Sequence, residues 1–324
     1  TRGKPASGLY QYEAAAVLSG QGDTYQANTT NEHQWKKTEA LTLCEGVIKN
    51  YPESRGAEKS RTLKSDIKRP YLHLRSETDN PIQQTSRALV NYKNIDELKL
   101  TAHRITQNEW TKLEDLYPDD KKLQFIKKLP EVESWETSLK TENDYQSHST
   151  EIAIPPLKNG HYIILAQYND DKTNTFAYNK IQVTNLALIT TQTDALHDFQ
   201  VVDRNTGKPI TGAELHFSYR LDYNDKRLSK TLITDKTGTV SIKSRSKNWS
   251  EIDITIKHDG ERAFYENYYI YRRYDNTAPT DSYPCFLFTD RSIYRPGQPL
   301  YFKGIALKSG VNKSIVLENA GVTV

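Results

Sequence analysis

Methionine, clustered charge and long apolar runs are missing from this sequence. It has no methionine in 324 residues, and its net charge is only +3. No long Lys/Arg run is present, so we expect no nucleic-acid partner, which would require clustered positive charge. No apolar run approaches the roughly 20 residues of a membrane-spanning helix. The first residues, TRGKPASG, do not form a signal peptide and lack an initial methionine, so we expect that a leader or tag preceded them.

Cysteine is almost as scarce. The two cysteines, Cys44 and Cys285, lie in segments that we assign to different domains. We expect two unpaired and mostly buried thiols, and a structural disulfide is the alternative. So few cysteines do not distinguish a cytosolic protein from a periplasmic one.

The residue groupings that perform catalysis or bind metals are also missing. The histidines never fall at the short spacings of a metal site; they are His33, His73, His103, His148, His161, His197, His216 and His258. The pairs Asp119-Asp120 and Asp170-Asp171 lack the alternating oxygen ligands of a tight Ca²⁺ site, and we interpret them as a solvated face and a turn. No Ser–His–Asp arrangement can be argued without a fold that supplies it. We therefore expect no enzyme activity, no metal and no cofactor.

Helical patterns dominate the beginning of the chain. An alanine-rich run at 10–18 and apolar residues at helical spacing from 34 to 51 predict helices. Pro52 ends the second helix, and Ser54 is the expected N-cap of the next. The helix–YPES–helix pattern resembles a tetratricopeptide-type pair. We assign residues 1–66 to a helical N-terminal segment that packs against or caps the rest, and a peptide-binding groove is the alternative.

Strand patterns with a period of two dominate the remainder. YLHLRSE and SRALVNYK alternate in this way, and a polar helical stretch at 108–128 follows. We assign residues 67–186 to a first antiparallel β-sandwich with an inserted helix. Residues 187–277 have short strands separated by frequent turn signals and are assigned to a second sandwich. In residues 252–257 apolar and polar side chains alternate, so one face of that strand should point to the core.

Residues 278–324 begin a third unit without completing it. They supply only a few strands, which would leave an open apolar face and unpaired strand edges. We therefore expect the chain to be part of a longer protein. The predicted fold class is mainly β, with tandem antiparallel β-sandwiches of the immunoglobulin or fibronectin type III kind preceded by a short α-helical segment.

Tyrosine is abundant, with 21 residues against eight phenylalanines. The stretch AFYENYYIYRRY concentrates tyrosines beside two arginines, and both residue types are favoured at interfaces. The candidate interface residues are Tyr268, Tyr269, Tyr271, Arg272 and Arg273. The alternative is that these tyrosines alternate on a solvated face of a sheet.

The most specific motif is TDRSIYRPGQPLYFKG at 289–304. The pair Pro296-Gly297 predicts a type II turn, because proline presets φ at the first central position and glycine accepts a positive φ at the second. Pro299 cannot donate a ladder hydrogen bond, which places this part at a sheet edge or a bulge. The motif therefore predicts a shape and implies no reaction.

This motif resembles the strand motif that opens one of the macroglobulin domains in the alpha-2-macroglobulin family. The resemblance rests on Asp290, Arg291, Tyr294, Arg295, Pro296, Gly297, Tyr301, Phe302 and Gly304. A second stretch, DRNTGKPITGAELHF…TDKTGTVSI, is similar to the preceding macroglobulin domain. The order of the pieces fits the bacterial branch of the family, and the resemblance covers about residues 70–324, so the sandwiches are expected to be macroglobulin-like.

The resemblance implies a large protease trap, which cages a protease after the protease cuts a bait segment. Many members also use a Cys–Gln thioester with the motif CxEQ, but neither Cys44 in LCEGV nor Cys285 in PCFLF is part of one. The implied role is therefore the scaffold at the N-terminal part of a bacterial endopeptidase inhibitor, without a bait region.

The resemblance also implies partners and a location. The partners would be target proteases, bound by the full-length protein, and other domains of the same chain. The location would be the periplasm or the outer cell surface, with a lipid anchor upstream. The alternative is a cell-surface adhesion or carbohydrate-binding protein built from tandem β-sandwiches.

Overall fold

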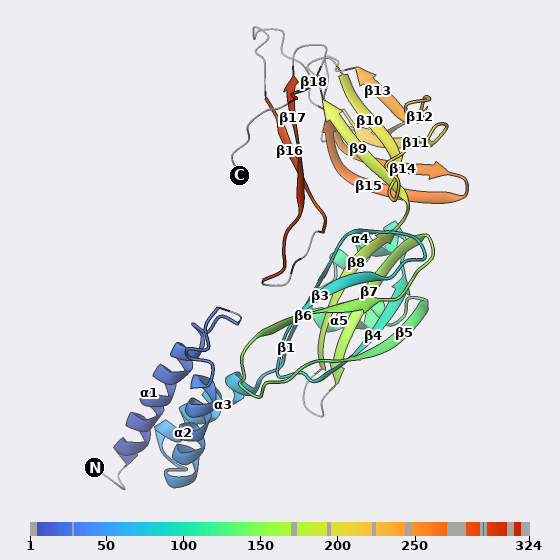
Figure 1. Cartoon of the computed structure of the whole chain (residues 1–324). Helices are drawn as coiled ribbons and strands as arrows, with labels where there is room; N and C mark the ends of the chain where they lie inside the picture. The colour runs from blue at the N-terminus through green and yellow to red at the C-terminus, as the bar shows by residue number, and fades with distance from the viewer. Residues whose placement is uncertain are drawn as a thin grey trace.

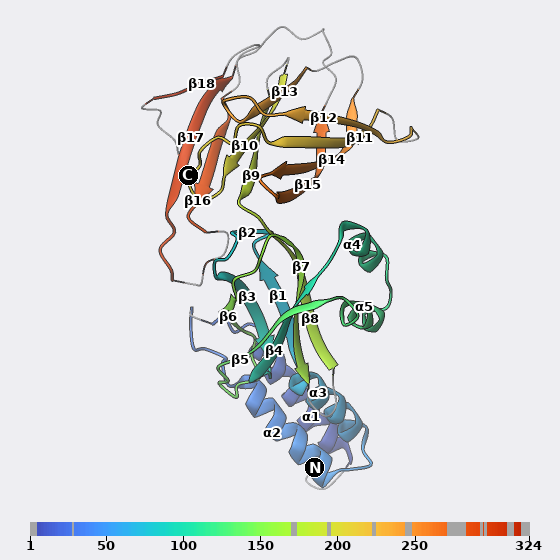
Figure 2. The ribbon, with the colours of Figure 1, turned by 90° about the vertical axis from the view of Figure 1, so that its right-hand side faces the viewer.

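The structure is a computed structural model that describes residues 5–27, 29–169, 174–192, 196–221, 225–243, 248–270, 283–291, 294, 297–309 and 314–318. Helices lie at one end of the molecule, a first pair of sheets lies in the middle and a second pair lies at the other end (Figure 1). The last strands lie beside the second pair of sheets in both views (Figure 2). None of the helices in the described ranges is long and apolar enough to cross a membrane.

The helical segment contains α1 (Pro5–Gly22), α2 (Lys36–Asn50) and α3 (Arg55–Lys68). It is therefore a three-helix unit in the described residues, in which α1 contains the alanine-rich run and α2 and α3 form the pair joined by YPES. The Ser54 side chain accepts a hydrogen bond from the backbone N–H of Ala57, which confirms the expected N-cap of α3. Helix α1 completes this unit, because buried apolar side chains of α2 and α3 pack together with Ala15 of α1.

The first pair of sheets is an antiparallel sandwich with one short parallel contact. One sheet has the order β1-β3-β6, and the other has the order β2-β8-β7-β4-β5. The strands are β1 (Tyr71–Ser76), β2 (Asp79–Asn80), β3 (Ser86–Lys93), β4 (Glu97–Arg104), β5 (Glu131–Ser138), β6 (His148–Ile154), β7 (Gly160–Asn169) and β8 (Asn174–Val183). Only β2 and β8 run parallel in the described residues. A single apolar cluster fills the space between the two sheets.

The outer face of the five-stranded sheet is covered by two short helices, α4 (Gln107–Glu114) and α5 (Asp119–Ile126) (Figure 2). The sequence predicted one helical stretch here. Pro118 separates the two helices, because proline cannot donate the hydrogen bond that a continuous helix requires. Buried side chains of both helices pack on Ile163 and Leu165 of β7, so β7 is buried on both of its faces.

The second sandwich consists of a sheet with the order β13-β10-β9 and a sheet with the order β12-β11-β14-β15. The strands are β9 (Leu186–Gln192), β10 (Leu196–Asp203), β11 (Glu214–Arg220), β12 (Leu228–Ile233), β13 (Thr239–Lys243), β14 (Trp249–His258) and β15 (Glu261–Ile270). The alternation predicted for β14 is confirmed, since Ile252, Ile254 and Ile256 are fully buried. Phe199 and Phe217 meet edge to face across this core, with ring centroids 5.1 Å apart.

The last described sheet has the order β16-β17-β18, with strands β16 (Cys285–Thr289), β17 (Phe302–Ser309) and β18 (Ser314–Val316). All residues of β16 are exposed, including Phe286 and Phe288 on one face and Leu287 on the other. Both cysteines are free, as expected, but only Cys44 is buried; Cys285 is exposed because this sheet is uncovered.

The predicted fold class is confirmed. The described chain is mainly β, with antiparallel sandwiches preceded by a helical segment. The proposed domain boundaries at 66/67, 186/187 and 277/278 stay predictions, and residues 271–282 around the last of them lie outside the described ranges.

Helices α1 and α3 touch backbone to backbone at Gly56. A Cβ atom built there would lie 2.3 Å from the carbonyl carbon of Gly8 and 2.6 Å from the nitrogen of Leu9. No flexible side chain could move aside to relieve these contacts, so the close packing requires glycine. Gly46 in α2 provides the contrast, since a Cβ atom there meets nothing within 4 Å.

We predict opposite effects of two glycine substitutions. Gly56→Ala forces α1 and α3 apart and should destabilise the chain by about 2 kcal/mol. Gly46→Ala adds only helix propensity and should stabilise it by up to about 1 kcal/mol. Urea unfolding followed by far-UV circular dichroism measures both. Equal effects of the two substitutions would show that α1 does not dock on α3 in this way.

Candidate functional site

The most organised polar site lies where the two sandwiches meet, at the outer edge of β15. An edge strand leaves backbone N–H and C=O groups without strand partners. Here the side-chain amide of Asn159 accepts from the N–H of Arg262 at 3.0 Å and donates to its C=O at 2.8 Å. Gln182 does the same at Phe264, accepting from its N–H at 2.5 Å and donating to its C=O at 3.2 Å. Two side-chain amides of the first sandwich thus take the place of a neighbouring strand.

Gln182 also joins its own sandwich to this contact. Its Nε2 donates to Asp79 at 2.6 Å, and its Oε1 lies 2.9 Å from Nε2 of His161. Because an amide oxygen only accepts, His161 must carry a proton on Nε2. Burial is the main cause that lowers the pKa of His161, so the neutral imidazole is the donor at neutral pH. The His161 ring meets the Phe264 ring edge to face, with centroids 6.2 Å apart.

The Glu261 carboxylate fixes the segment between β8 and β9. It accepts from the Thr184 hydroxyl at 2.6 Å and from the backbone N–H groups of Asn185 and Leu186. The Tyr265 hydroxyl, whose pKa is raised by burial, donates to the Leu186 carbonyl at 2.6 Å. The connection between the sandwiches is therefore hydrogen-bonded on both sides and does not behave as a free linker.

Two ion pairs flank this junction. Lys180 lies 3.4 Å from Glu266, and Arg204 lies 3.3 Å from Glu77. Both pairs are partly exposed, so each contributes little to stability on its own. Their main effect is to restrict the relative orientation of the sandwiches at the edges of the contact.

A second polar junction joins the helical segment to the first sandwich. The Asp144 carboxylate is buried and accepts from Gln34 at 3.1 Å, from the N–H of Gln146 at 3.0 Å and from His148 at 2.9 Å. Burial by itself would raise the pKa of this carboxyl, but these hydrogen bonds lower it below its ordinary value. The Gln146 amide in turn donates to the Gln34 carbonyl at 3.0 Å.

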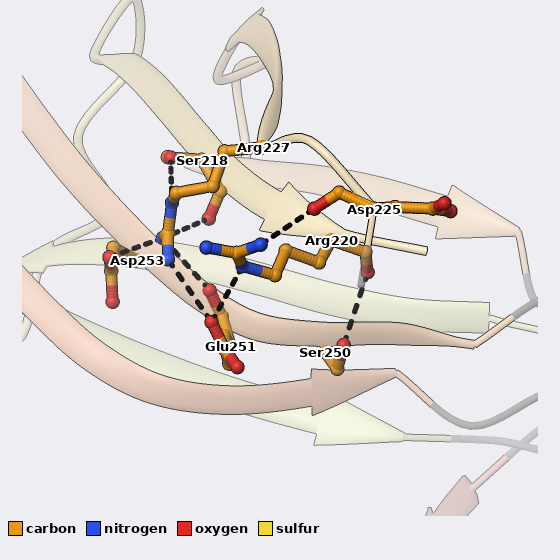
Figure 3. Close-up of polar contacts among 7 residues, drawn as sticks. All are labelled: Ser218, Arg220, Asp225, Arg227, Ser250, Glu251 and Asp253. Carbon is orange, nitrogen blue, oxygen red and sulfur yellow. Dashed lines mark hydrogen bonds and ion pairs between the residues drawn. The ribbon is translucent and has the colours of Figure 1, made fainter. Parts of the chain in front are cut away.

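A third polar cluster lies on the outer face of the sheet that contains β11 and β14 (Figure 3). Arg227 donates to Asp253 at 2.5 Å and to the Ser218 hydroxyl at 2.9 Å, while Arg220 donates to Glu251 at 2.9 Å. Burial raises the pKa of the Asp253 carboxyl, and the adjacent Arg227 opposes that shift. Each arginine is paired with a carboxylate, and these pairs fasten the start of β12 to its sheet.

The residues of the predicted family motif meet around Asp290. Its Oδ1 accepts from the Tyr294 hydroxyl at 2.5 Å and from the Tyr301 N–H at 3.1 Å. Its own N–H donates to the Tyr301 carbonyl at 3.0 Å. The Arg291 N–H donates to the Tyr294 hydroxyl at 3.1 Å. The hydrogen bond from Tyr294 is the main cause that lowers the pKa of Asp290. The aspartate therefore joins the start of the segment between β16 and β17 to its end by hydrogen bonds.

The other motif residues are placed in part. Gly297 has a φ of +81°, as a type II turn requires at its second central position, whereas Arg295 and Pro296 lie outside the described residues. Phe302 and Gly304 belong to β17, where Gly304 pairs with Leu287 of β16. The motif thus has a structural role in the described residues.

The structure places the two described tyrosines of the predicted interface in different environments. Tyr268 packs on the core of the second sandwich and meets the Phe199 ring at 6.3 Å. Tyr269 is 49% exposed and is the candidate that faces outward. Tyr271, Arg272 and Arg273 lie outside the described residues. An interface at Tyr269 stays a prediction.

The junction residues were not found from the sequence. Asn159 and Gln182 stand 103 and 82 positions before the residues that they contact, and no local motif marks a glutamine that pairs with a distant backbone. Among the described residues, no three His, Cys, Asp or Glu side chains are grouped so that they could hold a metal ion.

We predict that Gln182→Leu weakens the junction. The leucine fills similar space but leaves the N–H and C=O of Phe264 without their partners, which should cost about 2 kcal/mol. Gln200→Leu is the control, because Gln200 is only partly buried and its side-chain hydrogen bond to the Thr237 carbonyl is exposed to solvent; its cost should be below about 0.5 kcal/mol. Chemical unfolding of both variants measures the difference. A Gln182→Leu chain as stable as the control would contradict the amide pairing.

The lowered pKa of Asp144 predicts a pH dependence. The native carboxyl binds its proton less readily than the unfolded one, so it stabilises the fold above about pH 4. That contribution is lost as the pH falls through the native pKa. Asp144→Asn should therefore be less stable than the natural chain at pH 7, with a difference that shrinks toward pH 2. Thermal midpoints from pH 7 to pH 2 test this against the exposed control Asp115→Asn. A pH-independent difference would contradict the prediction.

No family model and no curated protein matches this chain. Among solved structures, Escherichia coli alpha-2-macroglobulin spanning domains MG0-NIE-MG1 is 14% identical, with a TM-score of 0.43, over 61% of this chain and 64% of that one. A structure spanning NIE-MG1 is 14% identical, with a TM-score of 0.41, over 61% of this chain and 97% of that one.

The native conformation of the whole Escherichia coli alpha-2-macroglobulin is 14% identical with a TM-score of 0.36, over 74% of this chain. The match spans only 15% of that protein, and it spans less than two thirds of the MG0-NIE-MG1 structure. A likeness this low in identity and TM-score does not establish a family. The description of the fold rests instead on the strand pairing of the chain itself.

Proposed function

We propose that this chain is the N-terminal scaffold part of a bacterial alpha-2-macroglobulin-like endopeptidase inhibitor. The observation that carries the proposal is the set of hydrogen bonds around Asp290, which joins the two ends of the segment between β16 and β17. The aspartate and both tyrosines of the family-like motif are joined by hydrogen bonds. The residue types that define the resemblance therefore share one structural task, as expected if the motif is a true domain signature.

The hydrogen-bonded junctions support a scaffold role. A protease trap must hold its walls in a defined shape until the bait is cut, and then move as large rigid pieces. The amides of Asn159 and Gln182 and the carboxylate of Glu261 fix one sandwich to the next. The Asp144 cluster fixes the helical segment in the same way.

The proposal includes partners and a location. The full-length protein would act on target proteases, and other domains of the same chain would contact this part. It would be exported to the periplasm or the outer cell surface and held there by a lipid anchor. The chain would contribute no catalytic group, metal or cofactor of its own.

The test is a caging assay on the full-length protein that contains this chain. The protein is mixed with a broad-specificity protease, and cleavage of a large protein is compared with cleavage of a small chromogenic peptide. A cage excludes only the large substrate, so we expect protection of the protein and continued cleavage of the peptide. The 324-residue chain alone is the control and should protect neither substrate.

Two variants connect the assay to the motif. Asp290→Ala should weaken protection of the large substrate, because it opens the segment between β16 and β17. Asp119→Ala, which changes an exposed carboxylate on α5, should leave protection unchanged. Cleavage of both substrates at the uninhibited rate by the proteases tried would refute the trap.

A further inference from the structure

A cavity of about 310 Å³ lies between the first sandwich and the sheet of β16, β17 and β18. The first sandwich supplies most of its lining, from the segment between β1 and β3, the start of β3, and Glu151 of β6. The last lining residue is Arg291, which follows β16 and belongs to the family-like motif. In both views the lower end of the β16–β17 pair lies beside the first sandwich, although the second sandwich separates them in the sequence (Figure 1, Figure 2).

Glu151 is unusually buried for a residue on the outer face of a sheet. Its side chain is only 5% exposed, whereas Ser149 and Ala153, which share its face of β6, are exposed. Glutamate is rarely buried unless it is paired. Arg87 of β3 pairs with it at 3.2 Å, but the side chain of Arg87 is itself 64% exposed. The outer face of β6 is therefore covered at Glu151, where it meets the cavity that Arg291 also lines.

Charges of both signs and from all three units meet around this cavity. Glu77 and Glu151 supply two carboxylates of the first sandwich, and Arg87 supplies one of its guanidinium groups. Arg204 of the second sandwich lies 3.3 Å from Glu77. Arg291 supplies the charge of the third unit. Ion pairs contribute more when several charges form a network than when they stand alone, so this arrangement favours a defined position of Arg291.

The first-sandwich side of the cavity is held in place by the second sandwich. The backbone N–H of Ile82 donates to the Asn185 side chain at 3.1 Å, and Gln84 donates to the Asn205 side chain at 3.2 Å. The segment between β1 and β3 therefore has a fixed shape whether or not the third unit rests on it. The third unit meets this segment around an open space and not through a shared apolar core.

We propose that this contact is a latch, in which Glu77 and Glu151 hold Arg291 and so position the third unit on the first sandwich. The motif then has a second task besides joining its own ends. The latch can open while the two sandwiches stay joined, because the amides of Asn159 and Gln182 join them independently. In the open state Arg291 keeps Asp290, 3.7 Å away, as its partner. The latch does not depend on the proposed protease trap.

Pulsed electron resonance on the 324-residue chain tests the latch with two pairs of spin labels. The first pair joins Glu133→Cys on β5 to the exposed Cys285 on β16, since Cys44 is buried. The reference pair joins Glu133→Cys to Lys230→Cys on β12, with Cys285→Ser. We expect both distance distributions to be narrow at low salt. Only the first should broaden between about 0.01 M and about 1 M salt, because the screening length falls from about 30 Å to about 3 Å.

A first pair that is broad already at low salt would overturn the latch. So would a first pair that stays narrow at high salt, or equal broadening of both pairs.

Charge reversal connects the latch to its residues. Glu151→Lys should abolish the narrow peak of the first pair at low salt, and adding Arg291→Glu should restore it. Arg291→Glu alone should also abolish the peak, and this side chain is 52% exposed, so its replacement disturbs no core. Ser149→Lys is the control, because it adds the same charge on the same face of β6 but outside the cavity. A narrow peak in both single variants, or no recovery in the double variant, would refute the latch.

The reference pair shows in each variant whether the two sandwiches remain folded and joined.

Discussion

The arrangement of the two sandwiches depends on the need of one edge strand for hydrogen-bond partners. β15 ends its sheet, and its outward backbone groups would otherwise face water or another chain. The amides of Asn159 and Gln182 present an N–H donor beside a C=O acceptor at a spacing that fits a peptide group, so each pairs with one residue of β15. This pairing protects the edge and, at the same time, fixes the orientation of the next sandwich.

Hydrogen bonds and ion pairs join the units, beside ring contacts such as that of His161 with Phe264, whereas each sandwich has its own apolar core. The clusters of buried apolar side chains in the first and second sandwich share no residue. Hydrogen bonds depend on direction more strongly than apolar contacts do, so polar junctions select one orientation. Such junctions suit a scaffold whose shape matters and whose parts later move as rigid bodies. The Asp144 cluster applies the same principle between the helices and the first sandwich.

The sequence predicted what repeats locally and missed what depends on distant partners. Alternation identified β14, and Ser54 identified the start of α3. The edge strand β5 was missed, because its residues Glu131–Ser138 are polar and mostly exposed and so lack an apolar alternation. Asn159 and Gln182 were missed because their partners lie far along the chain. The motif at Asp290 was recognised from its order of residue types, although that order does not predict which hydrogen bonds its residues form.

The central claim is that side-chain amides hold the sandwiches in one orientation. Pulsed electron resonance measures this directly, with spin labels at Glu133→Cys on β5 and Lys230→Cys on β12 and with the exposed thiol removed by Cys285→Ser. We expect one narrow distance distribution, which broadens when Asn159→Leu and Gln182→Leu are added together. A distribution that is equally broad with and without the two amides would contradict the account, and so would one that stays narrow after both are removed.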